Sequence, residues 1–410
     1  MHHRSVSDAS RSPPELALCG GPPAFASPRY VGTPGIPDRA TLHARLDAML
    51  DARRLTNDGP FAREFEARLG ELNGGVEAVA VCNATIGMQL LLKALGVAGE
   101  VVLPSFTFIA TAHACAWEGC EPVFADVDEH THVLDADSVA ATMSDRTAAI
   151  VGVHLWGRMC PVEALEALAA ARGIPLVFEA AHALGCTHRG RPMGGLGTAS
   201  VVSFHATKLV QSLEGGAILT PDRDLAARLR LMRNFGFAGY DHVVALGTNA
   251  KLDEFSAAVG IGSLDCLERI VARNRANRVA YREALDGLPG LSLYEYDEAE
   301  DNNFQYLIAV VDPARCPLAR DELVAVLHAE NVIARRYFHP GCHRSAPYAA
   351  RPVVLPVTER LSERLIAFPT GEGVDAADIA RIGTILDTAC ARAGAVRHAL
   401  SEGRRARLAA

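Results

Sequence analysis

Short apolar segments alternate with amphipathic segments along the middle of the chain. The apolar segments have no polar alternation and are predicted to be strands at residues 100–103, 122–125, 148–154, 175–178, 201–204 and 216–219. The amphipathic segments predict helices at residues 85–95, 107–118, 162–172 and 225–234. Continuous apolar strands separated by helices are typical of a largely parallel sheet that is covered on both faces. This region is therefore predicted to be α/β.

The pattern changes after about residue 255. A long helical pattern covers residues 254–288, with a break expected near the glycines of residues 260–262. Further strands are predicted at residues 291–294, 305–310 and 332–335, and further helices at 320–329 and 376–395. We expect a flexible lead-in at residues 1–25, a large domain at 26–255, a smaller α+β domain at 256–396 and a tail at 397–410. The Arg- and Ala-rich tail is predicted to be either a solvated helix or disordered.

Composition excludes several classes of protein. The 410 residues carry a net charge of −8, which argues against nucleic acid or an anionic membrane as the main partner. The ten cysteines are scattered without zinc-ligand spacing, so we expect buried free thiols in a reducing cytoplasm. No apolar run reaches the roughly 18 residues of a transmembrane helix, and the N-terminus lacks the apolar core of a signal peptide. The sequence favours a cytoplasmic enzyme.

Three groups with related chemistry follow predicted strands. Glu179 comes at the end of one strand, and Ser203 and Lys208 come at and just after the next. Pyridoxal phosphate (PLP) needs a lysine for its Schiff base, a carboxylate at its ring nitrogen, and hydroxyl and amide groups for its phosphate. Taken singly, a solvated lysine and a capping or ion-paired glutamate are the simpler interpretations. The combination, followed by Glu-Gly-Gly at residues 214–216, favours a PLP site.

Seven segments in order carry a family resemblance over roughly residues 15–395. They are CNAT at 82–85, LPSFTF at 103–108, VFADVD at 123–128, VHLWG at 153–157, EAAH at 179–182, SFHATK at 203–208 and GTNAK at 247–251. On these segments the chain resembles the DegT/StrS-type PLP-dependent sugar aminotransferases. NDGP at 57–60, NFGF at 234–237 and YFHPGCH at 337–343 make it similar to the enzymes that aminate C4 of a nucleotide-linked 4-keto-6-deoxyhexose, as in desosamine-type pathways.

The resemblance implies a PLP fold-type-I enzyme with a mostly parallel seven-stranded sheet and a smaller α+β domain. Lys208 would form the Schiff base and transfer protons, and Glu179 would keep the pyridine nitrogen protonated. Family members typically carry Asp where this chain carries Glu179. We expect the role to be kept with a lower rate or cofactor affinity; the alternative is that Glu179 is displaced and the ring poorly activated.

The same resemblance implies further cofactor contacts. His182 would lie near the phenolic oxygen of the cofactor, and Phe108 would stack on its ring. Ala84 and Thr85 at a helix start, together with Ser203, would hold the phosphate. Each of these residues also has a purely structural interpretation, as a buried histidine, a core aromatic or a helix cap.

The partner and substrate residues are implied in the same way. Asn249 would reach the phosphate from the neighbouring subunit, which makes the homodimer the catalytic unit. Lys251 would meet substrate phosphates, and Tyr337 and His343 would line the sugar pocket, although all three could be only structural. His130 and His132 follow a strand in a loop, and we predict no metal there.

The expected reaction is ping-pong transfer of the amino group of L-glutamate to a keto carbon, C4 by preference, of a probably dTDP-linked keto-6-deoxyhexose in deoxyaminosugar biosynthesis. Alternatives are the C3-keto isomer or a keto-cyclitol. A PLP-binding regulatory or sensor protein without turnover is the alternative from another class; the intact Lys208 argues against it. A nucleotide-binding protein without PLP is disfavoured because no GxGxxG motif follows the early strands.

Overall fold

A seven-stranded sheet is the centre of the larger part of the molecule. The computed structural model describes residues 15–409, and only the backbone of residues 403–409. Along the sheet the strands follow the order β2-β10-β9-β6-β5-β3-β4, and only β10 runs antiparallel to its neighbours. Their bounds are Glu77–Val81 (β2), Glu100–Pro104 (β3), Glu121–Ala125 (β4), Thr147–Val153 (β5), Leu176–Glu179 (β6), Ala199–Ser203 (β9) and Gly216–Thr220 (β10). The predicted α/β fold is confirmed.

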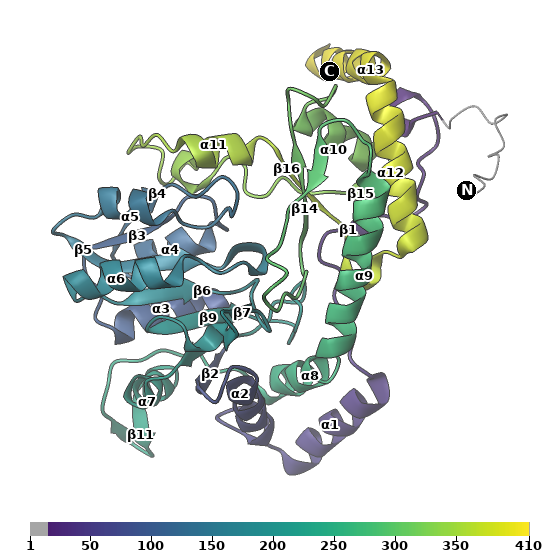
Figure 1. The fold of residues 1–410 in the computed structure, drawn as a ribbon. Coiled ribbons are helices and arrows are strands. Elements are labelled where there is room, and N and C mark those ends of the chain that lie inside the picture. Colours follow the sequence, from purple (N-terminus) through teal and green to yellow (C-terminus); the bar gives the residue numbers. More distant parts are fainter. Residues whose placement is uncertain (1–14, 410) are drawn as a thin grey trace.

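Helices cover both faces of this sheet (Figure 1). They are α2 (Pro60–Leu72), α3 (Ala84–Ala94), α4 (Ala110–Trp117), α5 (Ala136–Thr142), α6 (Val162–Arg172), α7 (Arg223–Met232) and α8 (Glu254–Leu264). Successive residues of one strand enter different hydrophobic clusters; Val177 belongs to one and Phe178 to the other. Burial of both strand faces explains why the strands read as continuous apolar runs.

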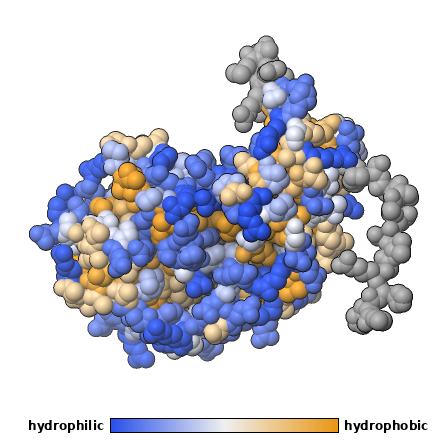
Figure 2. Space-filling model, turned by 45° about the horizontal axis from the view of Figure 1, so that its top comes forward, coloured by the Kyte–Doolittle hydropathy of each residue, from blue (hydrophilic) through white to orange (hydrophobic). Residues whose placement is uncertain are grey.

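A second hydrophobic unit stands beside the sheet domain, with the long helix α9 running along it (Figure 1). Its antiparallel sheet contains β13 (Leu291–Leu293), β14 (Leu307–Val311) and β16 (Leu365–Phe368). Its helices are α9 (Leu267–Leu285), α10 (Arg320–Ala329), α12 (Ala376–Ala391) and α13 (Ala393–Ala409), and α11 (Pro356–Ser362) lies over the edge of the large sheet. The surface seen in Figure 2 is mostly hydrophilic with separate apolar patches.

Short elements complete the described chain. Helix α1 spans Arg39–Ala52, and the two-residue strand β1 (Arg29–Tyr30) pairs in parallel with β15 (Val332–Ile333). Two hairpins are formed by β7 (Thr187–His188) with β8 (Arg191–Pro192), and by β11 (Phe237–Gly239) with β12 (His242–Val243). No helix within the described residues is long and apolar enough to cross a membrane.

The predicted break at residues 260–262 is wrong. The glycines lie inside α8, and the helical stretch is interrupted at residues 265–266 instead. A Cβ on Gly260 would lie 2.7 Å from the Phe65 ring, and a Cβ on Gly262 would lie 2.9 Å from Pro37. The glycines are there because neighbouring elements pack against the helix backbone, and α8 is not broken by them.

The predicted flexible lead-in is wrong for residues 15–25. Leu16 and Phe25 are buried in the hydrophobic cluster of the smaller domain. The backbone N–H groups of Ala17 and Ala24 both donate to the carboxylate of Glu330, each at 2.7 Å. This segment is part of the folded structure; residues 1–14 lie outside the described range. Of the two alternatives for the tail, the structure has the helix, α13.

Candidate active site

The carboxyl ends of β6 and β9 bring the predicted catalytic groups to one edge of the sheet. The two strands are parallel neighbours, and Glu179 pairs in register with Val201. Ser203 ends β9, and Lys208 follows five residues later in a turn. Parallel strands point their carboxyl ends toward the same edge, so a polar site is formed where both apolar strands stop.

Lys208 is held by a residue of the smaller domain. Its Nζ donates to the hydroxyl oxygen of Tyr306 at 3.0 Å and lies 5.4 Å from the centroid of that ring. Burial by itself would lower the pKa of Lys208, but Tyr306 and then the Glu179 carboxylate outweigh it and raise the pKa above its ordinary value. Lys208 therefore stays protonated until a base takes up its proton, and only the neutral amine can then react with an electrophile.

Glu179 is only lightly bonded. One carboxylate oxygen accepts from the backbone N–H of Ala181 at 2.9 Å. Burial raises the pKa of Glu179, and Lys208 and the Ala181 amide oppose that rise in part. A carboxylate with a raised pKa and spare acceptor capacity is poised to bind a cationic N–H group, which is the form of a protonated pyridine ring.

His182 is buried in a stack of aromatic rings. The centroid of its ring lies 5.6 Å from that of the Trp156 ring, with an interplanar angle of 16°. It lies 4.2 Å from the centroid of the Tyr306 ring. The backbone N–H of Trp156 donates to Nδ1 of His182 at 3.4 Å, which assigns the proton of a neutral ring to Nε2. Burial, and secondly Lys208, hold the pKa of His182 well below its ordinary value. His182 is therefore a neutral hydrogen-bond donor beside Lys208.

Gly216 brings the predicted phosphate residues together. It pairs in register with Ser203, and a Cβ at this position would lie 2.6 Å from the backbone nitrogen of Ala84. Asn83 caps α3 by accepting from the Ile86 N–H at 2.9 Å. The first amides of α3, at Ala84 and Thr85, lie at the positive end of the helix. This arrangement fits a phosphate group.

Phe108 and Tyr337 line one hollow of about 300 Å³, which the loop at residues 335–342 closes from one side. Phe108 precedes α4, which begins at Ala110, so the prediction that it lies on a helix is wrong. Phe108 is 60% exposed. This exposure suits a residue that stacks on a ligand and does not suit an aromatic residue of the core. Tyr337 stacks on Phe338, with the ring centroids 4.9 Å apart.

Asn249 and Lys251 contact each other. Lys251 Nζ donates to Asn249 Oδ1 at 2.6 Å and lies 4.7 Å from the centroid of the Phe235 ring. Asn249 is exposed and forms an isolated antiparallel bridge with Asn234, three residues before β11. Their predicted contacts with the cofactor phosphate and with substrate remain predictions.

His343 has a position that does not suit a substrate residue. It is buried, with its Nδ1 2.6 Å from Ser105 Oγ and its Nε2 3.4 Å from a Glu359 oxygen. Both ring nitrogens therefore have protein partners, and the structural interpretation of His343 is the better one. His132 is also buried and accepts from the Trp156 indole N–H at 3.3 Å. Within residues 15–402 no group of three or more His, Cys, Asp or Glu side chains is placed to hold a metal ion.

Sequence reasoning missed Tyr306 and the stacking role of Trp156. Trp156 follows β5 inside the VHLWG segment, so its place next to a strand end was a usable signal. Tyr306 stands just before β14 of the smaller domain, 98 residues from Lys208. No local pattern connects the two residues, because the contact depends on how the domains pack.

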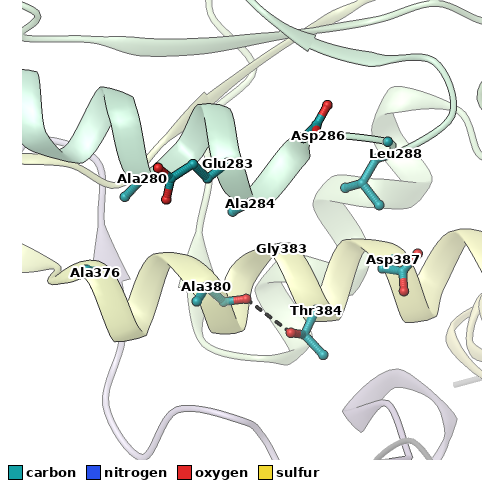
Figure 3. Close-up of a pocket in the computed structure, with 11 residues that line it drawn as sticks. Ala280, Glu283, Ala284, Asp286, Leu288, Ala376, Ala380, Gly383, Thr384 and Asp387 are labelled. Carbon is teal, nitrogen blue, oxygen red and sulfur yellow. Dashed lines mark hydrogen bonds between the residues drawn. The ribbon is translucent and has the colours of Figure 1, made fainter. Parts of the chain in front are cut away.

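Another hollow lies between α9 and α12 (Figure 3). It measures about 540 Å³, and its polar lining consists of Glu283, Asp286, Asp387 and Thr384 among small residues. It contains neither a lysine nor an aromatic ring, so it is not a candidate for the chemistry at Lys208.

The sheet and the Lys208 edge define an aminotransferase of PLP fold type I. A solved structure of DesI in the presence of its TDP-sugar product is 49% identical to this chain, with a TM-score of 0.89 over 95% of this chain and 98% of that one. Residues 38–387 match the DegT/DnrJ/EryC1/StrS aminotransferase family, and the chain belongs to that family. Its members are PLP-dependent enzymes, and the predicted resemblance is confirmed.

Other relatives agree. The dTDP-4-amino-4,6-dideoxy-D-glucose transaminase of Escherichia coli is 30% identical over 346 residues, which are 83% of this chain and 92% of the relative. The enzyme of the same name from Shigella dysenteriae is 33% identical over 315 residues, covering 76% and 85%. DesV of S. venezuelae, solved in complex with a ketimine intermediate, is 30% identical with a TM-score of 0.80 over 88% of this chain and all of that one.

Proposed function

We propose that this protein transfers the amino group of L-glutamate to C4 of dTDP-4-keto-6-deoxyglucose, with PLP as its cofactor. The observation that carries the proposal is that Glu179, at the end of β6, and Lys208, in the turn after β9, lie at the same edge of the sheet and interact electrostatically. The substrate is supported by the relatives: DesI was solved in the presence of its TDP-sugar product, and two others are dTDP-4-amino-4,6-dideoxy-D-glucose transaminases.

The residues of the edge suit the cofactor. Glu179 would keep a proton on the ring nitrogen, and the amides of Ala84 and Thr85 with the Ser203 hydroxyl would hold the phosphate. When bound, PLP supplies an aldehyde that accepts the amino group and a ring that withdraws electrons from the reacting carbon. His182 would donate Nε2–H, and Phe108 would cover the ring face.

Lys208 carries the protons of the reaction in this proposal. As a free amine, its Nζ would take a proton from the α-carbon of glutamate and would later deliver a proton to C4 of the sugar. The Tyr306 hydroxyl, 3.0 Å from Nζ, holds the amine at the site between these transfers. The aromatic stack of His182, Trp156 and Tyr306 keeps water away from the same atom.

We also propose that the protein works as a homodimer. The β11–β12 hairpin and its flanks expose large apolar side chains. Their contact with water is unfavourable, and their burial against a partner would be favourable. These side chains are Phe235, Phe237, Tyr240, Val243, Val244 and Leu246. Asn249 adjoins this surface. In a dimer it would contact the phosphate of the cofactor that is bound to the neighbouring subunit. Light scattering of the purified protein tests the state, and a monomer of full activity would refute it.

The position of amination is tested with ¹⁵N-labelled L-glutamate. The enzyme is mixed with dTDP-4-keto-6-deoxyglucose, with its 3-keto isomer and with a keto-cyclitol, and each product is analysed by NMR. We expect label at C4 of the first compound only, and none with the Lys208→Ala variant. Label at C3, or in the cyclitol alone, would refute the assigned substrate, and no labelled product at all would refute the aminotransferase proposal.

A further inference from the structure

Arg335 places a positive charge beside the candidate active site. Its backbone exchanges hydrogen bonds with Ala367 at 3.0 and 2.8 Å, so β16 fixes the point from which the side chain starts. The guanidinium carbon lies 5.3 Å from the centroid of the Tyr337 ring. Among the side chains that the structure describes, no carboxylate pairs with Arg335, whereas the adjacent Arg336 pairs with Asp321 at 3.4 Å.

The position of Arg335 links it to the chemistry at Lys208. It lines the 300 Å³ hollow together with Phe108 and Tyr337. The Tyr337 ring lies 6.0 Å from that of Tyr306, whose hydroxyl accepts from Lys208. Two aromatic residues in contact, Tyr337 and Tyr306, therefore lie between the guanidinium of Arg335 and the amine of Lys208.

Both substrates of the proposed reaction are anions that such a cation would attract. Glutamate brings two carboxylates and the nucleotide sugar brings a diphosphate, while the protein as a whole carries a net charge of −8. When the flat face of a guanidinium contacts an aromatic ring, the N–H donors along its edge remain available. Two parallel N–H groups can then donate to two oxygens of one carboxylate or phosphate. Resting on the proposed function, we propose that Arg335 is the anion-binding residue of this active site.

Two probes distinguish the source of the anion. Glutarate has the carboxylates of glutamate without its amine, and thymidine diphosphate has the diphosphate without the sugar. Their dissociation constants are measured by calorimetry on the PLP-loaded enzyme, on Arg335→Gln and on Arg335→Lys. The matched control is Arg360→Gln, which also removes one positive charge but breaks the exposed pair with Glu129 at 3.1 Å.

We expect Arg335→Gln to bind one probe about 10- to 100-fold more weakly, the effect of losing charge-assisted hydrogen bonds. Arg335→Lys should recover part of the loss, since it restores the charge without the two parallel N–H groups. Weaker glutarate binding assigns Arg335 to the amino donor, and weaker thymidine diphosphate binding assigns it to the nucleotide sugar.

Unchanged binding of both probes by Arg335→Gln, or an equal loss in Arg360→Gln, would overturn the proposal. So would a parent enzyme that binds neither probe. A parent enzyme that binds the probes through Arg335 but transfers no amine would instead refute the proposed function and leave the anion subsite standing.

Discussion

A buried and a half-buried glutamate of the large domain, Glu66 and Glu179, show how a structural carboxylate differs from a functional one. Glu66, on α2, is paired with Arg233, accepts from the backbone N–H of Ala80 at 2.8 Å, and lies 3.6 Å from Arg230. Glu179 has one hydrogen bond, from the amide two residues further along the chain. The two glutamates therefore differ in the number of partners that the protein gives their carboxylates.

The difference follows from the cost of burying charge. A buried carboxylate that serves the fold must be satisfied by the protein itself, as Glu66 is, or its desolvation is uncompensated. Glu179 is left partly uncompensated, which raises its pKa and reserves its oxygens for a ligand. The Glu66 region should therefore respond to mutation in stability, and the Glu179 region in catalysis.

Replacement of the lysine should give the largest effect. Lys208→Ala is expected to lower kcat on the order of 10⁴-fold or more, because it removes the general acid and base together with the covalent attachment. The melting temperature of the protein without cofactor should change little. Turnover close to that of the parent would break the assignment of Lys208.

The structural pair gives the opposite response. Glu66→Gln leaves the buried Arg233 with only the half-exposed Asp58 carboxylate, 3.1 Å away, and is expected to lower the free energy of unfolding by about 3 kcal/mol. Denaturant unfolding measures the loss, and kcat/KM of the protein that remains folded should be that of the parent. Lost activity with unchanged stability would contradict the comparison.

Substitution of Glu179 should reverse that result. Glu179→Ala is expected to lower kcat about 10²- to 10³-fold through loss of the charge opposite the ring nitrogen. Glu179→Asp, with the shorter side chain usual in the family, should match or exceed the parent. An alanine variant as active as the parent would remove Glu179 from the site.

Stability sharpens the contrast between the two glutamates. Because the folded protein raises the pKa of Glu179, its ionised form opposes folding at any pH above that raised pKa. Glu179→Gln is therefore expected to be as stable as the parent or more stable at pH 8, in contrast to Glu66→Gln. A loss of stability similar to that of Glu66→Gln would mean that Glu179 serves the fold.

Tyr306 should have the smallest effect of the series. It raises the pKa of Lys208, so Tyr306→Phe is expected to lower that pKa. Only the neutral amine of Lys208 can react with the PLP aldehyde. The rate at which cofactor-free protein binds PLP should therefore rise with pH. In Tyr306→Phe this rate should reach half its maximum at a lower pH than in the parent. We expect kcat to fall about tenfold, as for one charge-assisted hydrogen bond. An unshifted pH profile would leave Tyr306 a packing residue.

The sequence predicted the edge of the sheet well because its signals are local. Glu179 and Ser203 end apolar strands, and parallel strands must bring such ends together. Burial of both sheet faces leaves an unbroken apolar run for each strand. The family segments then assigned a cofactor to that edge.

What the sequence could not predict depends on contacts between distant segments. The glycines of α8 looked like a helix break because nothing nearby shows that Phe65 and Pro37 pack against them. Leu16 and Phe25 looked like part of a flexible lead-in because their partners lie in the smaller domain. His343 looked available for substrate until Ser105 and Glu359 were seen on its ring.

The central claim is that the lightly bonded Glu179 and Lys208 form a cofactor site for a 4-amino sugar. The most direct test is the reverse half-reaction, in which the PLP-loaded enzyme is mixed with dTDP-4-amino-4,6-dideoxyglucose or with the 3-amino isomer and the cofactor absorbance is followed. We predict rapid loss of the PLP band with the 4-amino sugar, little loss with the 3-amino isomer, and no conversion in Lys208→Ala. A band that persists with the 4-amino sugar, or that disappears only with the 3-amino isomer, would contradict the account.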